Sequence, residues 1–184
     1  MNIPKIAWIT VNHLCNLFYK WCYQKELSGK GKSMQKEMAK QIVRLLVEFQ
    51  PRTIILIGGE PTLWNHYFTL IKFIKEKGLR TTIVSNGLVY ANWKFTEKSK
   101  RSGFDSVTIS VKAFSRDGYE KACGRAGGYD MVKRALINLK KAGIKTMISI
   151  TISHSVIEKW KASFSFMREF PEEFYSFPLK NQLF

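Results

Sequence analysis

Residues 53–61 read TIILIGGEP, a run of β-branched and aliphatic residues that ends in two glycines, a glutamate and a proline. Ile and Thr at this density are typical of a buried strand of a parallel sheet. The two glycines would let a ligand approach the backbone closely, and Glu60 offers a carboxylate that can pair with an ammonium group. The alternative is a tight turn into a helix whose N-terminal end favours Glu60.

Four further β-rich segments flank this run, at residues 6–11, 81–85, 106–111 and 146–152. Three sets of apolar residues between them each fall on one helical face: Met38, Ile42, Leu45, Leu46 and Phe49; Tyr67, Leu70, Ile71 and Ile74; and Val132, Leu136 and Leu139. Residues 91–102 predict a weaker helix. Gly78, Gly103 and Gly143 each follow a helix end and precede an apolar residue, which indicates a cap leading into a strand. The alternation predicts an α/β fold with a parallel sheet of about five βα units.

The end of the chain departs from this alternation. Residues 164–184 contain six of the 13 phenylalanines, two prolines and no strand-like run. We therefore divide the chain into a βα core at residues 1–155 and a C-terminal helix with an irregular Phe-rich tail at residues 156–184. The tail either covers the core or stands where a natural continuation has been lost.

The charge balance is strongly basic, because 30 Lys+Arg and 14 Asp+Glu leave a net charge of +16 in 184 residues. A basic surface attracts phosphate groups, but these lysines are spread over every expected helix, so solvated helix faces are favoured over a nucleic-acid site. The content of 45% hydrophobic residues excludes general disorder. Without an apolar run of ~18–20 residues or a secretory signal, we expect a cytoplasmic protein outside the membrane.

Functional groups of parallel α/β folds gather in the loops at the carboxyl ends of the strands. The loop after the first strand contains Cys15 and Cys22. A cytosolic pair at this spacing indicates a metal or redox site more readily than a disulfide. Ordinary buried cysteines are the alternative, since two thiols do not complete a four-ligand site. His13 and His154 also fall at strand ends, where we expect structural roles.

Taken together, the strand-end loops resemble the radical S-adenosylmethionine (SAM) superfamily over residues 6–152. Its hallmark is C-x-x-x-C-x-Φ-C after the first strand, with Φ aromatic, and a GGEP-type loop after the second. Cys15 matches the first cysteine, Trp21 the aromatic position and Cys22 the last cysteine. The second motif is matched without a gap by Gly58, Gly59, Glu60 and Pro61. The next two strand ends are also similar, at Ser85-Asn86-Gly87 and Ser110-Val111-Lys112-Ala113.

This resemblance implies a partial (β/α) barrel, a partial TIM barrel, truncated to about five units. It implies a four-iron four-sulfur cluster held by Cys15 and Cys22, and reductive cleavage of SAM to a 5′-deoxyadenosyl radical. The SAM-binding residues implied are Trp21, Gly58, Gly59, Glu60, Pro61, Ser85, Asn86, Ser110 and Lys112. Implied partners are a peptide or small-molecule substrate and an electron donor such as flavodoxin or ferredoxin. The resemblance singles out no catalytic residue.

The sequence departs from the family at the middle cysteine, where Tyr19 stands. A phenol with a reference pKa of ~10 is neutral at pH 7 and is a hard oxygen donor, unlike a thiolate. We therefore expect an unstable or altered cluster and impaired catalysis. For Cys123, after the fourth strand, we expect a structural role instead of ligation. The alternative function is a cluster-free, degenerate or truncated relative that binds an anionic ligand, a peptide or nucleic acid.

Overall fold

A computed structural model describes residues 5–19, 21–22, 24, 26–27 and 33–151 of the chain. Its single sheet has five parallel strands in the order β1-β2-β3-β4-β5. The strands are β1 (Ile6–Thr10), β2 (Thr53–Ile57), β3 (Arg80–Ser85), β4 (Ser106–Val111) and β5 (Lys145–Ile150). The sheet does not close, since β1 and β5 are its two edges. The predicted α/β class with five parallel strands is confirmed.

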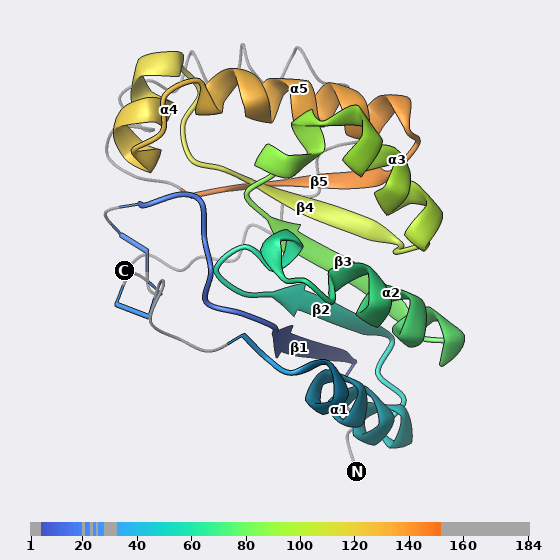
Figure 1. Ribbon diagram of the computed structural model, residues 1–184. Coiled ribbons are helices and arrows are strands. Elements are labelled where there is room, and N and C mark those ends of the chain that lie inside the picture. The colour runs from blue at the N-terminus through green and yellow to red at the C-terminus, as the bar shows by residue number, and fades with distance from the viewer. Residues whose placement is uncertain (1–4, 20, 23, 25, 28–32, 152–184) are drawn as a thin grey trace.

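Helices connect each strand to the next, as Figure 1 shows. They are α1 (Lys36–Glu48), α2 (Tyr67–Glu76), α3 (Trp93–Ser102), α4 (Arg116–Cys123) and α5 (Gly128–Lys141), with short 3-10 turns η1 (Pro61–Leu63) and η2 (Leu88–Ala91). Right-handed crossovers between sequential parallel neighbours place the helices on one face of the sheet. All strands therefore end at the same edge, where their following loops meet.

The core lies between the sheet and this helical layer. In β2, Ile54 and Leu56 are fully buried, whereas Ile55 between them is only partly buried. Trp8 of the edge strand β1 is 60% exposed. Within the described residues, the strand at 53–57 is therefore more deeply buried on the face that the helices cover than on the other face.

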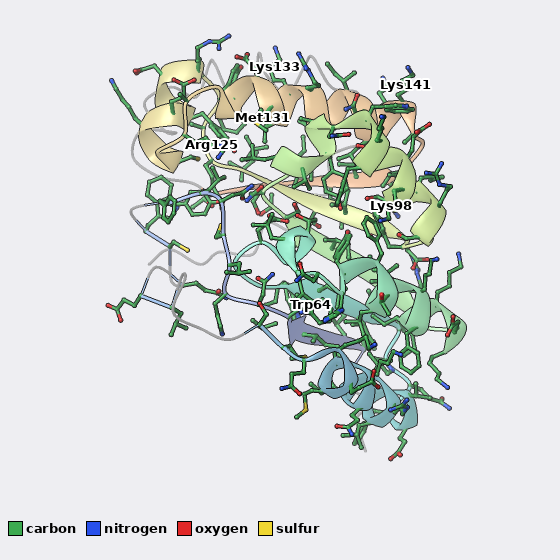
Figure 2. The ribbon with its side chains drawn as sticks, in the orientation of Figure 1. Trp64, Lys98, Arg125, Met131, Lys133 and Lys141 are labelled. Carbon is green, nitrogen blue, oxygen red and sulfur yellow. The ribbon has the colours of Figure 1, made fainter. Side chains whose placement is uncertain are left out.

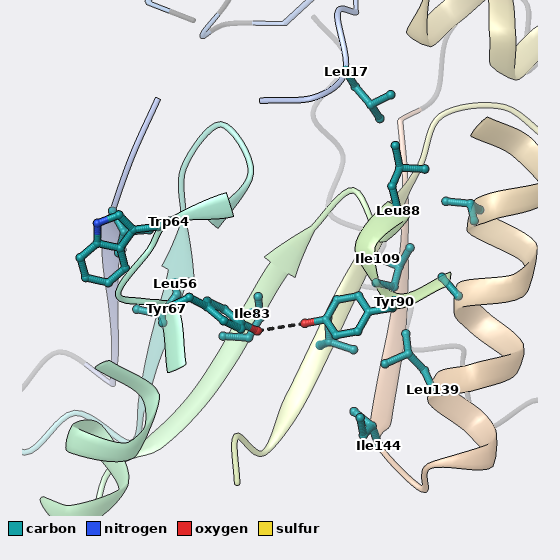
Figure 3. Packing of buried hydrophobic residues seen from close by; sticks show 14 of the residues in the cluster. Leu17, Leu56, Trp64, Tyr67, Ile83, Leu88, Tyr90, Ile109, Leu139 and Ile144 are labelled. Atoms are coloured by element: carbon teal, nitrogen blue, oxygen red, sulfur yellow. Dashed lines mark hydrogen bonds between the residues drawn. The ribbon is translucent and has the colours of Figure 1, made fainter. Parts of the chain in front are cut away.

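Two tyrosines link α2 to η2 inside this layer. The hydroxyl groups of Tyr67 and Tyr90 lie 2.9 Å apart and share a hydrogen bond (Figure 3). Both side chains are fully buried, and neighbouring apolar residues such as Ile83 and Leu139 pack in the same cluster. The bond satisfies two polar groups that burial would otherwise leave unpaired.

The buried face of α1 is narrower than its apolar pattern predicts. Ala39 and Val43 are buried, but Met38, Leu45 and Phe49 are more than half exposed. Because α1 packs at the edge of the sheet beside α2, only one side of it meets the core. The prediction of a single buried face through all five apolar residues is wrong for these three.

Helix α4 was not predicted as a helix. The Ser115 hydroxyl accepts a hydrogen bond from the N–H of Gly118 and caps its start, and Gly124 ends it at φ +63°. Asp117 lies in the first helical turn and pairs with Lys121 at 3.0 Å. The cap glycines after α2, α3 and α5 are confirmed by positive φ values at Gly78, Gly103 and Gly143.

The division of the chain at residues 155 and 156, the last helix and the Phe-rich tail lie outside the described residues, as does His154. Among the helices that the structure describes, none has the length and apolar character to cross a bilayer.

Candidate functional site

The Glu60 carboxylate joins the ends of β2 and β3. Its Oε1 accepts hydrogen bonds from the Thr62 N–H (3.2 Å), the Thr62 hydroxyl (2.5 Å) and the Ser85 hydroxyl (2.8 Å). Its Oε2 accepts the N–H of Asn86 (2.7 Å). Burial raises the pKa of Glu60, and these hydrogen bonds oppose the rise. We call Glu60, Thr62, Ser85 and Asn86 the Glu60 network.

Gly58 and Gly59 bring the backbones after β1 and β2 together. The N–H of Gly59 donates to the carbonyl of Asn12 at 3.0 Å, and that of Glu60 donates to Leu14 at 2.6 Å. A Cβ at Gly58 would lie 2.7 Å from Asn12 Oδ1, and one at Gly59 would overlap the Leu14 carbonyl. The glycines therefore permit the loop after β1 to dock on the loop after β2.

We call residues 12–19 and 21–22, which follow β1, the cysteine loop. Its residues Cys15, Tyr19 and Cys22 line one small cavity of about 20 Å³. The thiols of Cys15 and Cys22 are partly exposed and form no disulfide. Partial burial raises the pKa of Cys15. Asn86 reaches this loop, since its Nδ2 donates to Asn16 Oδ1 at 2.7 Å and lies 4.0 Å from Cys15 Sγ. Asn86 thus contacts both the Glu60 carboxylate and the cysteine loop.

Tyr19 is buried between cationic and aromatic neighbours, with only 9% of its surface exposed. Lys112 Nζ lies 4.9 Å from the centre of its ring, and the Trp21 ring stacks beside it at 6.4 Å. Burial raises the pKa of Tyr19 far above its ordinary value. The Tyr19 hydroxyl is thus a buried oxygen donor at the position of the middle cysteine.

Lys112 follows β4, and its ammonium points toward the end of β5. Nζ donates to the Thr151 hydroxyl at 3.2 Å. Burial lowers the pKa of Lys112, while the nearby thiols of Cys123, Cys22 and Cys15 oppose this shift. The ammonium therefore lies within electrostatic reach of all three cysteines.

Most of the predicted site residues lie at the carboxyl edge of the sheet, either at the last residue of a strand or in the loops after β1 to β4. These are Cys15, Trp21, Cys22, Gly58, Gly59, Glu60, Pro61, Ser85, Asn86 and Lys112. Ser110 lies within β4 and pairs with Ser149 of β5. His13 contacts Gln24 through Nδ1 at 3.2 Å.

Sequence reasoning assigned no role in the site to Asn12, Thr62 or Thr151. The Asn12 amide donates to the Glu60 carbonyl at 3.0 Å. A polar residue directly after a strand was the available signal for Asn12, but its partners depend on contacts distant in sequence. The same is true of Thr62 and Thr151, whose contacts with Glu60 and Lys112 appear only in three dimensions.

The donor chemistry at this edge fits an iron–sulfur cluster at two positions out of three. Within the described part of the chain, no three His, Cys, Asp or Glu side chains are placed to hold a single metal ion. The thiols of Cys15 and Cys22 are the soft donors that iron–sulfur clusters take. The phenol of Tyr19 is a hard oxygen donor and does not match the thiolate that such a cluster takes at the third position.

A basic groove of about 370 Å³ lies away from this edge, between α1, α2 and α3. It is lined by Lys40, Phe68, Thr69, Lys72, Phe73, Glu76 and Lys98. Lys98 Nζ lies 4.4 Å from the Phe68 ring centre and Lys40 Nζ 5.4 Å from that of Phe73. Other basic residues lie elsewhere, since Figure 2 shows Lys133 and Lys141 on α5.

Comparison with known proteins connects these features. The family model of the radical SAM superfamily matches residues 9–166. Fe-coproporphyrin III synthase of Methanosarcina barkeri is 28% identical over 168 residues, which are 90% of this chain and 41% of that protein. A probable GTP 3′,8-cyclase of Metallosphaera sedula is 29% identical over 139 residues, 74% of this chain and 43% of that protein. The chain thus spans about two fifths of the length of these relatives.

Solved structures share the fold at low sequence identity. Native anSMEcpe with bound AdoMet (S-adenosylmethionine) has a TM-score of 0.73 and 18% identity, over 89% of this chain and 48% of that one. Streptococcus suis SuiB bound to the precursor peptide SuiA has a TM-score of 0.76 and 18% identity, over 92% of this chain and 38% of that one. The open sheet is therefore the partial barrel that the sequence predicts. This chain belongs to the radical SAM superfamily.

Proposed function

We propose that this chain is the SAM-binding and cluster-binding core of a radical SAM enzyme whose iron–sulfur site is impaired at Tyr19. One observation carries the proposal: Asn86 contacts the Glu60 carboxylate with its backbone and the cysteine loop with its side chain. A residue of the third strand end thus holds the two family motifs side by side. Superfamily membership implies a four-iron four-sulfur cluster and SAM as the groups bound there.

Cys15 and Cys22 would hold the cluster, which supplies the electron that cleaves bound SAM. The carbonyl groups of Gly58 and Gly59 would accept hydrogen bonds from the methionine ammonium. Because the Glu60 oxygens already accept four hydrogen bonds, the main part of Glu60 would be to fix the backbone of residues 58–61. Pro61 begins η1 and stiffens this segment.

The nucleoside end of SAM would lie toward the loops after β1, β3 and β4. Trp21 is more than 40% exposed and offers an aromatic face to adenine. Ser85 and Asn86 shape the floor through the Glu60 network. Ser110 and Lys112 are near the far side of the site, where a hydroxyl and an ammonium suit the ribose and the methionine carboxylate.

The first experiment is anaerobic iron–sulfur reconstitution of the unmodified chain and of Tyr19→Cys, followed by titration with SAM in a calorimeter. We expect Tyr19→Cys to bind about four irons per chain and to bind SAM. We expect the unmodified chain to bind fewer irons or to lose them faster on exposure to a chelator. Failure of both proteins to bind either iron or SAM would contradict the proposal.

For the substrate we propose a peptide or a small molecule, and for the electron donor a flavodoxin or a ferredoxin. The peptide is favoured by the structural neighbour SuiB, which was solved with its precursor peptide SuiA. An assay of SAM cleavage with reduced flavodoxin, in the Tyr19→Cys protein, tests the donor. If 5′-deoxyadenosine forms with dithionite but with neither flavodoxin nor ferredoxin, the proposed electron donors would be contradicted.

A second function, binding of an anionic ligand without a cluster, is favoured by the groove between α1, α2 and α3. Lys40, Lys72 and Lys98 line it, and none of them forms an ion pair within the described residues. Binding of a DNA oligonucleotide that weakens steeply as salt rises, and that is lost in Lys72→Glu, would support this function. Unchanged binding of the oligonucleotide by Lys72→Glu would exclude the groove as its binding site.

A further inference from the structure

The groove between α1, α2 and α3 combines aromatic rings with cations. Phe68 and Phe73 of α2 are partly buried and pack against the core. Lys98 extends from α3 to the Phe68 ring, with Nζ 4.4 Å from its centre (Figure 2). The cations around the Phe73 ring are Lys40 and Arg44, both at 5.4 Å, and Lys77 at 5.5 Å. Together with Lys72, which also lines the groove, we call these four residues the groove cations.

The charge of the groove cations is not neutralised by neighbouring carboxylates. Among the ion pairs within the described residues, none contains a groove cation. Glu76 is the acidic residue in the lining of the groove, and it takes part in none of these pairs either. An anion that enters the groove would therefore meet cations held beside aromatic rings and would break no ion pair of the described chain. This charge predicts an anionic partner.

The other groups in the groove restrict the kind of anion. Bases of single-stranded nucleic acid bind by stacking on aromatic rings. Here the Lys98 ammonium already lies over the Phe68 ring, and the Glu76 carboxylate would repel phosphates. Apolar rings, cations, the Thr69 hydroxyl and one carboxylate are instead the mixture that a polypeptide with acidic and apolar side chains complements. A second copy of this chain is disfavoured, because two chains of net charge +16 repel each other.

We propose that this groove binds an acidic segment of another protein. An aliphatic side chain of the segment packs against Phe68 and Phe73, and its carboxylates pair with Lys72 and Lys98. The volume of about 370 Å³ lies within the range of sites that hold ligand groups of this size. The inference rests on the second function proposed above, since it names the partner of the same groove. It does not depend on an iron–sulfur cluster.

The test measures binding of a short fluorescein-labelled peptide of glutamate and leucine to the full chain by fluorescence anisotropy, without added iron. Lys72 and Lys98 are exposed, so their replacement should leave the fold intact. We expect Lys72→Ala and Lys98→Ala each to weaken binding about threefold, and the double variant about tenfold. Lys141→Ala is the matched control, because Lys141 Nζ also lies over a ring, that of Trp93, at 4.8 Å, but does not line the groove. We expect it to bind the peptide like the unmodified chain.

Two further measurements separate a groove for a peptide from a general attraction of anions. A peptide with serine in place of each leucine should bind about tenfold more weakly, because it lacks the apolar contact. Thr69→Trp places a bulky side chain at an exposed position within the groove and keeps every groove cation. We expect this variant to weaken binding of the leucine peptide by a similar factor, with an unchanged thermal unfolding midpoint.

The possible failures distinguish this inference from the second function on which it rests. Equal affinity of the double lysine variant and Lys141→Ala for the peptide would overturn the inference, as would equal affinity of the leucine and serine peptides. Binding of a DNA oligonucleotide that the double variant loses, with no binding of the peptide, would overturn the inference and leave the second function standing. Binding of neither the peptide nor the oligonucleotide would remove both.

Discussion

Glu60 and Tyr19 are both buried acidic groups at the carboxyl edge of the sheet, but their surroundings differ. The Glu60 oxygens accept four hydrogen bonds, from Thr62, Ser85 and Asn86. Tyr19 instead lies beside the Trp21 ring and under the Lys112 ammonium. One group has an environment made for a carboxylate, whereas the other is a neutral phenol at a thiolate position.

The different surroundings of Glu60 and Tyr19 show that the residues that hold the loops in place are distinct from the residues expected to bind metal. The Glu60 network ties the ends of β2 and β3 together, so it stabilises the fold whether or not a ligand is bound. The cysteine loop is held through backbone contacts with Gly59 and Glu60 and through the Asn86 side chain. The identity of residue 19 can therefore change the metal chemistry while the loop stays docked.

The largest expected effect concerns the docking of the two regions on each other. In Gly59→Ala, the new Cβ would overlap the Leu14 carbonyl, which is backbone and has little freedom to move. We expect the free energy of unfolding to fall by about 4 kcal/mol, measured by urea denaturation. Gly78→Ala is the control, since its Cβ meets open space and only its positive φ costs about 1–2 kcal/mol. Equal losses in the two variants would contradict close docking at Gly59.

A somewhat smaller effect is expected within the Glu60 network. Glu60→Gln places an amide where two acceptor oxygens receive four hydrogen bonds, so at least one buried donor loses its partner. We expect a loss of about 3 kcal/mol of stability in the iron-free protein. Glu76→Gln, on the exposed end of α2, is the control and should change little. A stability of Glu60→Gln equal to that of the control would show that the network does not support the scaffold.

The link between the two regions should have an intermediate effect. Asn86→Ala removes the hydrogen bonds to Asn16 and to the N–H of Leu88, and we expect it to cost about 1–2 kcal/mol. We also expect Cys15 to react faster with iodoacetamide, because the loop loses its side-chain attachment. Asn65→Ala, at an exposed position before α2, is the control. An unchanged rate of Cys15 alkylation would mean that Asn86 does not hold the cysteine loop.

The smallest effect is expected at Tyr19 itself. Tyr19→Phe keeps the buried ring and removes only the hydroxyl, so stability should change by less than about 1 kcal/mol. Because we propose that the phenol is not a ligand, we expect the iron bound after reconstitution to equal that of the unmodified chain. A clear fall in iron content in Tyr19→Phe would show that the phenol oxygen does bind iron. It would contradict the proposal that Tyr19 takes no part in metal binding.

Much of the fold follows from short-range patterns. The strands at Thr53–Ile57 and Ser106–Val111 coincide with the predicted segments, and the cap glycines adopt positive φ. Helix α4 was missed because capping by Ser115 and Gly124, and not an apolar stripe, defines it. The exposed side of α1 was missed because an apolar pattern does not reveal how wide the covered face is.

The site was predicted in part for the same reason. Motif spacing places Cys15, Cys22 and Glu60 in loops, and parallel strands bring those loops to one edge. Spacing does not reveal that the Glu60 oxygens are occupied by Thr62, Ser85 and Asn86, since those bonds depend on side-chain orientation. The role of Asn86 as a contact between both motifs likewise appears only in three dimensions.

The sequence by itself determined the alternation of strands and helices, the family and the departure at Tyr19, because each is a property of residues close together in the chain. Only the tertiary structure decided what surrounds Tyr19 and what lies beside Cys123. A residue on α4 meets the loop after β1 because parallel strands bring distant segments to one edge, where Phe18 binds the Cys123 carbonyl. The third cysteine, for which the sequence predicts a structural role, is fully buried at the end of α4.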